Sequence, residues 1–242
     1  MKSIGVVLAR GGSKRLPRKN VQPLVGFPLV AWTCRAALAS RIDRVILSTE
    51  DEEIIGIGRN QGIDVPFTRP TALAEDFARD IDIVLHAVDE CQSIYQEAYD
   101  IVVIIQATTP FVRPDQLDAC VERLEVSNFA CVFTARKVED HPRWAWTIRS
   151  SGQAEPYMGK LTPSEQHGQN LPVAYYPSGG AWAVRVAAMR QQQTVYCEPL
   201  GIVEVPWQYA VDIDDDRGWM IAEAAARKYK LRPVDLAAAR RT

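Results

Sequence analysis

The sequence lacks the features that mark membrane, fibrous and secreted proteins. Its 242 residues include 14 Gly and 15 Pro, too few for a collagen or a low-complexity chain. The longest apolar runs, such as residues 101–105, fall far short of the roughly 20 residues that span a bilayer. The apolar run at residues 4–9 is also too short for the core of a secretory signal. We therefore expect neither a membrane partner nor a signal peptide.

Cysteine is scarce and unpatterned. The five cysteines are odd in number, widely scattered and free of any Cys-x-x-Cys pair, and only three histidines accompany them. This usage favours free thiols in the core over disulfides or a metal cluster. We expect a protein of the reducing cytoplasm.

Neither sign of charge is in excess. The chain has 28 Lys and Arg against 30 Asp and Glu, a net charge of -2, which excludes a globally basic nucleic-acid binder. Hydrophobic residues make up 47% of the chain, as in ordinary globular proteins. A chain of this length buries a sizeable core without disulfides.

Short apolar runs alternate with segments of helical periodicity. Strands are predicted at residues 4–8, 44–48, 101–105, 130–135, 181–186 and 201–205. Helices are predicted at residues 28–39, 82–91, 114–125 and 217–230, and one more begins at Glu50 behind a Thr49 cap. This order predicts βαβ units, and hence an α/β protein with a Rossmann-like, doubly wound, mainly parallel sheet.

One segment breaks the alternation. Residues 137–178 are rich in proline and aromatic residues, a composition that suits a lid or a dimer arm. We interpret residues 1–242 as a single domain with a lobe inserted at about 137–178. The tail ending at Thr242 is expected to fray.

The loop after the first strand carries the strongest chemical signal. From Arg10 to Lys19 it has five cationic residues and no acid. The same stretch contains the adjacent glycines Gly11 and Gly12. Paired glycines let successive N–H groups form an anion-binding nest, and open α/β sheets bind ligands at this edge. Neither the Walker pattern nor GxGxxG is present. The loop predicts a polyphosphate site of another kind.

A pair of acids near the other end of the chain suits a hard cation. In an extended segment Asp212 and Asp214 point the same way and present two carboxylates. Mg²⁺ needs few protein oxygens and completes its shell with water and phosphate, and Mn²⁺ is an alternative. Asp215 and Asp216 are expected to cap the following helix.

The run from Ala9 to Asn20 resembles the opening signature of the acylneuraminate cytidylyltransferase family, the CMP-sugar synthetases of sialic and related acids. Segments at residues 45–51, 69–74, 106–110 and 211–214 match the family in the same order. The resemblance implies a fold of the nucleotide-diphospho-sugar transferase type. It also implies a CTP site formed by Ala9, Arg10, Gly11, Gly12, Ser13, Lys14, Lys19, Asn20 and Arg69.

Within that site, the resemblance gives each group a role. The cationic side chains and Ser13 hold the phosphates, Asn20 reads the cytosine, and Arg69 contacts the base. Gln106 and Thr108 lie against the sugar acid. The expected catalytic residues are Arg10, Lys19, Asp212 and Asp214, with the last two as metal ligands.

The departures from the family cluster where the sugar is selected. Arg143 stands where sialic acid-specific members have a lysine, and Tyr176 stands in place of an arginine. Asp80 replaces a serine near the base-binding segment. A related eight- or nine-carbon 2-keto acid is therefore a better substrate than sialic acid, with Arg143 and Tyr176 expected in its pocket.

The sequence hypothesis is a homodimeric cytidylyltransferase. The anomeric hydroxyl of the keto acid attacks the α-phosphorus of CTP in line and pyrophosphate leaves, without a covalent intermediate. The general base is not identified, and a metal-bound hydroxide is one candidate. Alternatives are a nucleotidyltransferase for another sugar or nucleotide, a glycosyltransferase using Asp-x-Asp, and a nucleotide-binding module without catalysis.

Overall fold

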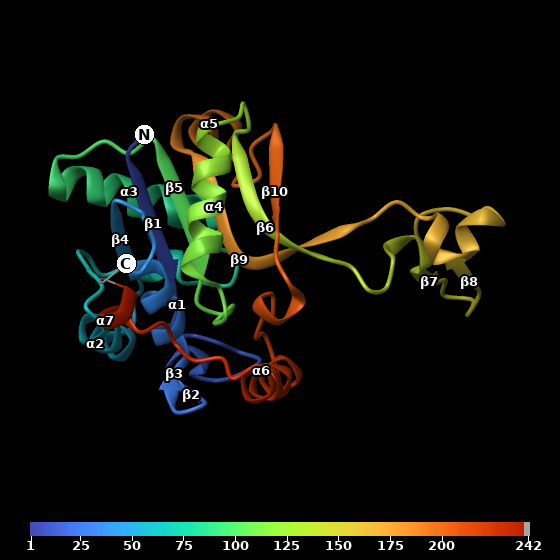
Figure 1. Ribbon diagram of the computed structural model, residues 1–242, viewed down its shortest axis with the longest axis horizontal. Helices are drawn as coiled ribbons and strands as arrows, with labels where there is room; N and C mark the ends of the chain where they lie inside the picture. The colour runs from blue at the N-terminus through green and yellow to red at the C-terminus, as the bar shows by residue number, and fades with distance from the viewer. Residues whose placement is uncertain (240–242) are drawn as a thin grey trace.

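The computed structural model describes residues 1–239, and the predicted frayed tail at 240–242 lies outside the described residues. A six-stranded sheet in the order β10-β6-β9-β5-β1-β4 forms its centre (Figure 1). The strands are β1 (Ser3–Leu8), β4 (Arg44–Ser48), β5 (Ile101–Gln106), β6 (Cys131–Lys137), β9 (Tyr175–Arg185) and β10 (Leu200–Glu204). All are parallel except β9, which runs antiparallel to β5 and β6. The predicted mainly parallel α/β sheet is confirmed.

Helices cover both faces of the sheet. Their bounds are α1 (Leu29–Leu38), α2 (Glu52–Gln61), α3 (Asp80–Tyr95), α4 (Pro114–Glu125), α5 (Val186–Gln192), α6 (Asp216–Lys228) and α7 (Leu236–Ala239). One core cluster packs α1, α2 and α4 against the sheet, and a second packs α3 and α5 against its other face. A third cluster holds α6 beside the small hairpin of β2 (Pro23–Leu24) and β3 (Phe27–Pro28). All five cysteines are buried free thiols, as predicted.

Two predictions about local structure were wrong in detail. The helix expected to start at Glu50 begins at Glu52, because the carboxylate of Asp51 caps it by accepting from the amide of Ile54 at 3.0 Å. The strand expected at 181–186 starts earlier, at Tyr175, and leads out of the inserted segment. Gly62 ends α2 in a left-handed conformation (φ 83).

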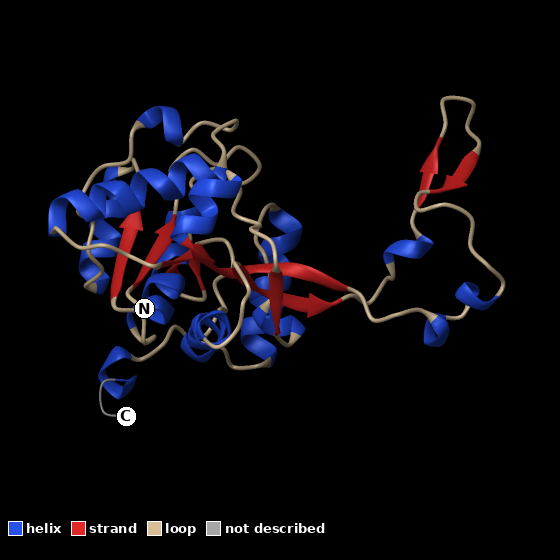
Figure 2. Ribbon diagram, turned by 90° about the horizontal axis from the view of Figure 1, so that it is seen from above, coloured by secondary structure: helices blue, strands red, loops and turns tan. Residues whose placement is uncertain are grey.

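Residues 138–174, here called the arm, leave the sheet between β6 and β9 and extend away from the body (Figures 1 and 2). The arm contains the short antiparallel pair β7 (Trp146–Ile148) and β8 (Ala154–Pro156) with single turns of 3-10 helix around it. Several of its large apolar side chains are exposed: Trp146 is 58% exposed, Ile148 75% and Tyr157 74%. Within residues 1–239 no helix has the length and apolar character needed to cross a membrane.

Candidate active site

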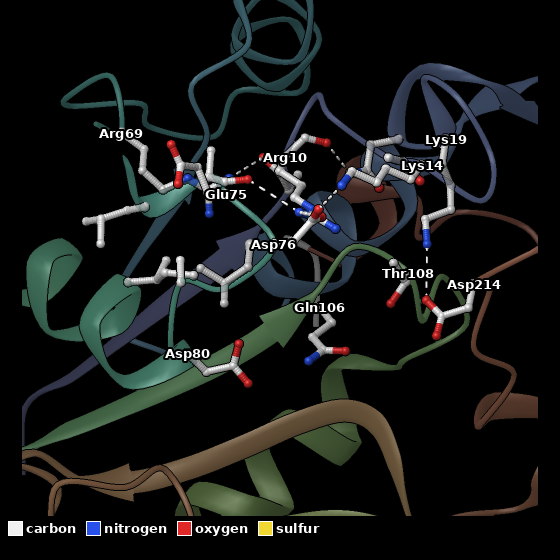
Figure 3. Close-up of a pocket in the computed structure, with 18 of the residues that line it drawn as sticks. Arg10, Lys14, Lys19, Arg69, Glu75, Asp76, Asp80, Gln106, Thr108 and Asp214 are labelled. Atoms are coloured by element: carbon white, nitrogen blue, oxygen red, sulfur yellow. Dashed lines mark hydrogen bonds and ion pairs between the residues drawn. The ribbon is translucent and has the colours of Figure 1, made fainter. Parts of the chain in front are cut away.

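A cavity of about 550 Å³ opens at the carboxyl ends of the parallel strands (Figure 3). Leu8 and Gln106, the last residues of β1 and β5, line this cavity. They lie side by side because the two strands are adjacent and pair in register. The loop that follows β1 (residues 9–20, here called the first loop) forms one wall. This is the edge at which parallel sheets bind ligands.

The cations of the first loop are held by acids from other parts of the chain. Arg10 pairs with Asp76 at 2.8 Å, and Lys14 pairs with the other oxygen of the same carboxylate. Both cations hold the pKa of Asp76 below its ordinary value. The two ion pairs keep the guanidinium group of Arg10 and the ammonium group of Lys14 side by side at the cavity wall, where an incoming anion meets them.

Lys19 joins the first loop to the acidic segment near the C-terminus. Its buried ammonium group donates to the backbone carbonyl of Ile213 and lies 3.3 Å from the carboxylate of Asp214. Arg15 lies 3.6 Å from the second oxygen of Asp214. The contact across 195 residues places a cation of the loop next to a predicted metal ligand.

Glu50 contacts the first loop with both of its carboxylate oxygens, directly and through Arg69. One carboxylate oxygen accepts the amide of Gly11 at 2.7 Å, and the other pairs with buried Arg69 at 2.8 Å. Arg69 also donates to the carbonyl of Ala9 at 3.2 Å. The amide of Gly11, expected to belong to an anion nest, is thus already occupied by a carboxylate.

Two buried polar atoms at this cavity have no hydrogen-bond partner within residues 1–239. Asn20 donates through Nδ2 to the carbonyl of Arg10 at 2.8 Å, but its Oδ1 is unpaired. The Nε of Arg69 is also unpaired, although the residue is only 4% exposed. An unmade hydrogen bond on a buried group costs about 1–3 kcal/mol. A ligand that forms hydrogen bonds with this acceptor and this donor therefore removes that free-energy cost.

Asp212 and Asp214 flank a buried anchor. The amide of Ile213 donates to the carbonyl of Thr108 at 2.9 Å, and its side chain is fully buried. Burial raises the pKa of Asp212 above its ordinary value, and the hydroxyl of Thr108 partly offsets this. The described residues contain no group of three metal-ligating side chains. Two carboxylates still fit Mg²⁺, which takes its remaining oxygens from phosphate and water.

The structure gathers most of the predicted site residues. The cavity is lined by Ala9, Arg10, Ser13, Lys14, Lys19, Asn20, Arg69, Gln106, Thr108 and Asp214. Asp212 lines a neighbouring cavity of about 250 Å³ that shares Gln106 with the first. The predicted contributors outside both sets of lining residues are Gly11, Gly12, Arg143 and Tyr176.

Arg143 and Tyr176 are engaged elsewhere in the single chain. Arg143 lies on the arm, where it donates to both carboxylate oxygens of Glu165 at 3.1 and 2.8 Å. Tyr176 lies at the base of the arm on β9, with the guanidinium of Arg136 5.8 Å from its ring centre. Their contact with a sugar acid stays a prediction.

Sequence reasoning missed three residues of the site. Asp76 and Glu50 hold the cations described above, and Trp182 lines the neighbouring cavity. In the sequence Glu50 is the first residue of a predicted helix, and Trp182 lies within a predicted strand. Only the long-range contacts distinguish them from such residues.

The chain also matches a known protein family. The Cytidylyltransferase family model matches residues 4–176, most of the chain. The chain belongs to this family. It is therefore a nucleotidyltransferase that uses CTP, and the predicted acylneuraminate cytidylyltransferase resemblance is confirmed.

Several relatives are named for related sugar acids. The chain is 31% identical to a pseudaminic acid cytidylyltransferase of Campylobacter jejuni, over 88% of this chain and 91% of the relative. It is 29% identical to a CMP-N,N'-diacetyllegionaminic acid synthase of Legionella pneumophila, over 92% and 95%. It is 28% identical to N-acylneuraminate cytidylyltransferase B of Danio rerio, over 93% of this chain and 51% of the relative.

Two solved structures share the fold. The structure of a CMP:2-keto-3-deoxy-manno-octonic acid synthetase in complex with CTP matches with a TM-score of 0.66 at 17% identity, over 95% of this chain and 100% of that one. A 4-diphosphocytidyl-2C-methyl-D-erythritol synthase from Anaerococcus prevotii matches with a TM-score of 0.63 at 13% identity, over 93% and 99%. At these identities the likeness concerns the fold alone.

Proposed function

We propose that this cytidylyltransferase activates a nonulosonic acid, with the cavity beside the first loop as its CTP site. The reaction joins the anomeric oxygen of the keto acid to the α-phosphorus of CTP, and the bond to pyrophosphate breaks. The relatives act, by their names, on pseudaminic, N,N'-diacetyllegionaminic and N-acylneuraminic acids, which supports this substrate class.

One observation carries the site assignment. The buried atoms Asn20 Oδ1 and Arg69 Nε have no hydrogen-bond partner within residues 1–239. Cytosine presents an amino donor and neighbouring acceptors on its edge. Asn20 is assigned to the amino group and Arg69 to an acceptor of the base. Both residues line the cavity that carries the cations, so one nucleotide meets both sets of groups.

The cations of the first loop are assigned to the triphosphate. Arg10 and Lys14 exchange their carboxylate partner Asp76 for phosphate oxygens, and Ser13 adds a hydroxyl. Lys19 stays beside Asp214 and holds a phosphate oxygen near the acidic segment. Fixed charges of this kind stabilise the negative charge that moves to the leaving pyrophosphate.

Asp212 and Asp214 are assigned as ligands of Mg²⁺, or of Mn²⁺ in its place. When bound, the ion neutralises charge on the phosphate oxygens. Gln106, which lines both cavities, and Thr108, which lines the first, orient the hydroxyls of the sugar acid. We infer a cytoplasmic reaction, supported by the five free thiols.

The arm is proposed as the contact between two copies of the chain. Its apolar side chains are exposed in the single chain, and its length carries them clear of the body (Figure 2). Packing of arms brings Arg143 and Tyr176 toward the cavity of a second copy, which completes the sugar pocket.

Pyrophosphate release tests the reaction. CTP is incubated with Mg²⁺ and each of a panel of sialic, legionaminic, pseudaminic and octulosonic acids. We expect release with an N-acylated nonulosonic acid and with CTP rather than ATP, GTP or UTP. Release falls at least 100-fold in Asp212→Ala and Asp214→Ala variants that keep the wild-type circular dichroism spectrum. Bound CTP without turnover across the panel contradicts the proposal and favours a binding module.

A further inference from the structure

Phe77 is an aromatic residue that the core of the protein does not use. Its side chain is 96% exposed, and within residues 1–239 no other large apolar side chain is exposed as much. A phenyl ring in water adds nothing to the stability of the single chain, because an apolar group gains free energy only when it leaves water. The ring is therefore available to a ligand or a partner.

Phe77 lies on a turn at the rim of the CTP cavity. The turn, residues 74–79 and here called the rim turn, joins the 3-10 helix at Thr71–Leu73 to α3. The neighbours on either side, Asp76 and Ala78, line the cavity, whereas Phe77 does not. The turn thus presents a carboxylate to the cavity and the adjacent aromatic ring to solvent.

Two cations of the first loop hold the rim turn in place. Arg10 and Lys14 both pair with the carboxylate of Asp76, and Arg10 also donates to the carbonyl of Ala74 at 3.4 Å. Within residues 1–239 the turn makes no other hydrogen bond or ion pair to a distant part of the chain, and none of its residues belongs to a hydrophobic core cluster. The position of Phe77 therefore depends on the two cations that the proposed function assigns to the triphosphate.

Binding of CTP at the proposed site changes this attachment. The phosphate oxygens take Arg10 and Lys14 from Asp76, and the triphosphate then repels the freed carboxylate. Asp76 and Phe77 are adjacent and face opposite ways, so a rotation of the turn that moves the carboxylate out of the cavity carries the ring toward it. This rotation breaks no core contact, because the turn makes none.

The nucleoside of CTP offers the ring a matching surface. Every base has a π face on which an aromatic side chain stacks. In Figure 3, Glu75 of the rim turn lies with Arg69, which is assigned to the base, on the side of the cavity away from Asp214. We propose that Phe77 closes over the nucleoside of bound CTP once the triphosphate has released the rim turn. This inference rests on the proposed function and adds a nucleotide-binding residue to its site.

Isothermal titration of the full chain with CTP and Mg²⁺, without sugar acid, tests the ring. Phe77→Ala should raise the Kd of CTP about tenfold, as the loss of one base–aromatic stack requires, while Phe77→Trp keeps a stacking ring and should stay within about twofold of wild type. Inorganic tripolyphosphate carries similar charges without a nucleoside, so its Kd should be the same in wild type and Phe77→Ala. Val126→Ala is the matched control, because Val126 is 86% exposed and lies outside the cavity, and it should keep the wild-type Kd of CTP.

Chymotrypsin tests the movement. This protease cleaves after exposed aromatic residues, so the Phe77–Ala78 bond is a cleavage site in the free protein. CTP should slow cleavage at this bond about tenfold, because cleavage follows the population of the open turn. Tripolyphosphate releases Asp76 but gives the ring nothing to stack on, so it should not slow cleavage. Mass spectrometry of the fragments separates this site from cleavage elsewhere in the chain.

Four results overturn the inference. Phe77→Ala binds CTP as tightly as wild type, it weakens CTP and tripolyphosphate alike, or CTP leaves cleavage after Phe77 unchanged. In the fourth, Phe77→Ala converts a dimer to a monomer, which assigns the ring to a contact between two copies of the chain. Failure of the proposed CTP site has a separate signature, because Arg10→Ala then keeps the wild-type Kd of CTP. If Arg10→Ala loses CTP binding and Phe77→Ala does not, the site stands and the closure is wrong.

Discussion

Glu50 contacts the first loop and the buried guanidinium of Arg69 with its two carboxylate oxygens. The acids two and three positions further along the chain differ from it, since Glu52 and Glu53 lie in the first turn of α2. Arg69 is nearly inaccessible to water, and this carboxylate is its ion-pair partner. If the proposed CTP site is right, Glu50 is a positioning residue that acts on CTP through Arg69 and Gly11.

Glu50→Gln keeps an acceptor for Gly11 but removes the charge that faces Arg69. We expect the KM of CTP to rise about tenfold while kcat changes less, because the base contact is misplaced and the reacting groups are not. The free energy of unfolding should fall by about 2 kcal/mol, as for a lost hydrogen bond to a charged group. Steady-state kinetics and urea unfolding measure the two effects.

Glu53→Gln is the matched control for this substitution. Glu53 pairs with Arg18 at the surface, where an ion pair contributes at most about 1 kcal/mol. The KM of CTP should stay within twofold of wild type. Equal effects of the two substitutions on the KM would contradict the positioning role of Glu50.

Asp76 pairs with Arg10 and Lys14, the cations that the proposed function assigns to the triphosphate. Asp76→Asn removes the competing charge, so we expect CTP to bind about threefold more tightly, a change typical of an exposed ion pair. Isothermal titration in the absence of sugar acid measures this affinity. Glu75→Gln removes the same charge from the same cavity wall without an ion-pair partner within residues 1–239. A gain as large in Glu75→Gln as in Asp76→Asn would show a general charge effect instead.

At the scale of elements, the arm has its own pH-dependent contact. The guanidinium of Arg143, aided by Thr162, lowers the pKa of Glu165 from 4.5 to about 2. Because the pKa is lower in the folded arm, the pair stabilises the arm fully above about pH 4.5. This stabilisation is lost as the pH falls from 4.5 toward 2.

We expect the arm to loosen in that window before the body unfolds. The indole N–H of Trp144 donates to the carbonyl of Glu165 at 3.0 Å, so its resonance in a nitrogen-15 NMR spectrum reports the change. In Glu165→Gln the same resonance should already be shifted at pH 7. A Trp144 signal that moves only together with the indole of buried Trp32 would contradict a local event.

Much of the element order could be predicted because local patterns determine it. The apolar run of β5 and the proline at the start of α4 are visible in a few neighbouring residues. The direction of β9 could not be predicted, because pairing with β5 and β6 joins residues far apart in sequence. The same limit hid the role of Glu50, whose partners lie 39 and 19 positions away.

At the scale of the whole molecule, the small net charge hides a division of opposite charges. Cations gather on the first loop, while Asp212 and Asp214 lie on the chain's later segment, and Lys19 bridges the two. A nucleotide with a divalent cation needs both signs at once in separate places. The fold supplies this by bringing the ends of β1 and β5 under a loop from each half of the chain.

The arm exposes apolar surface that no contact covers within residues 1–239. We expect the chain to sediment as a dimer, and Ile148→Asp to make it monomeric by placing a charge on that surface. If Arg143 reaches a second copy, the monomer keeps its affinity for CTP but its KM for the sugar acid rises at least tenfold. Ile94→Asp, the same substitution on exposed α3, should remain dimeric. A monomeric wild-type chain, or a monomeric variant with an unchanged KM for the sugar acid, would separate the arm from catalysis.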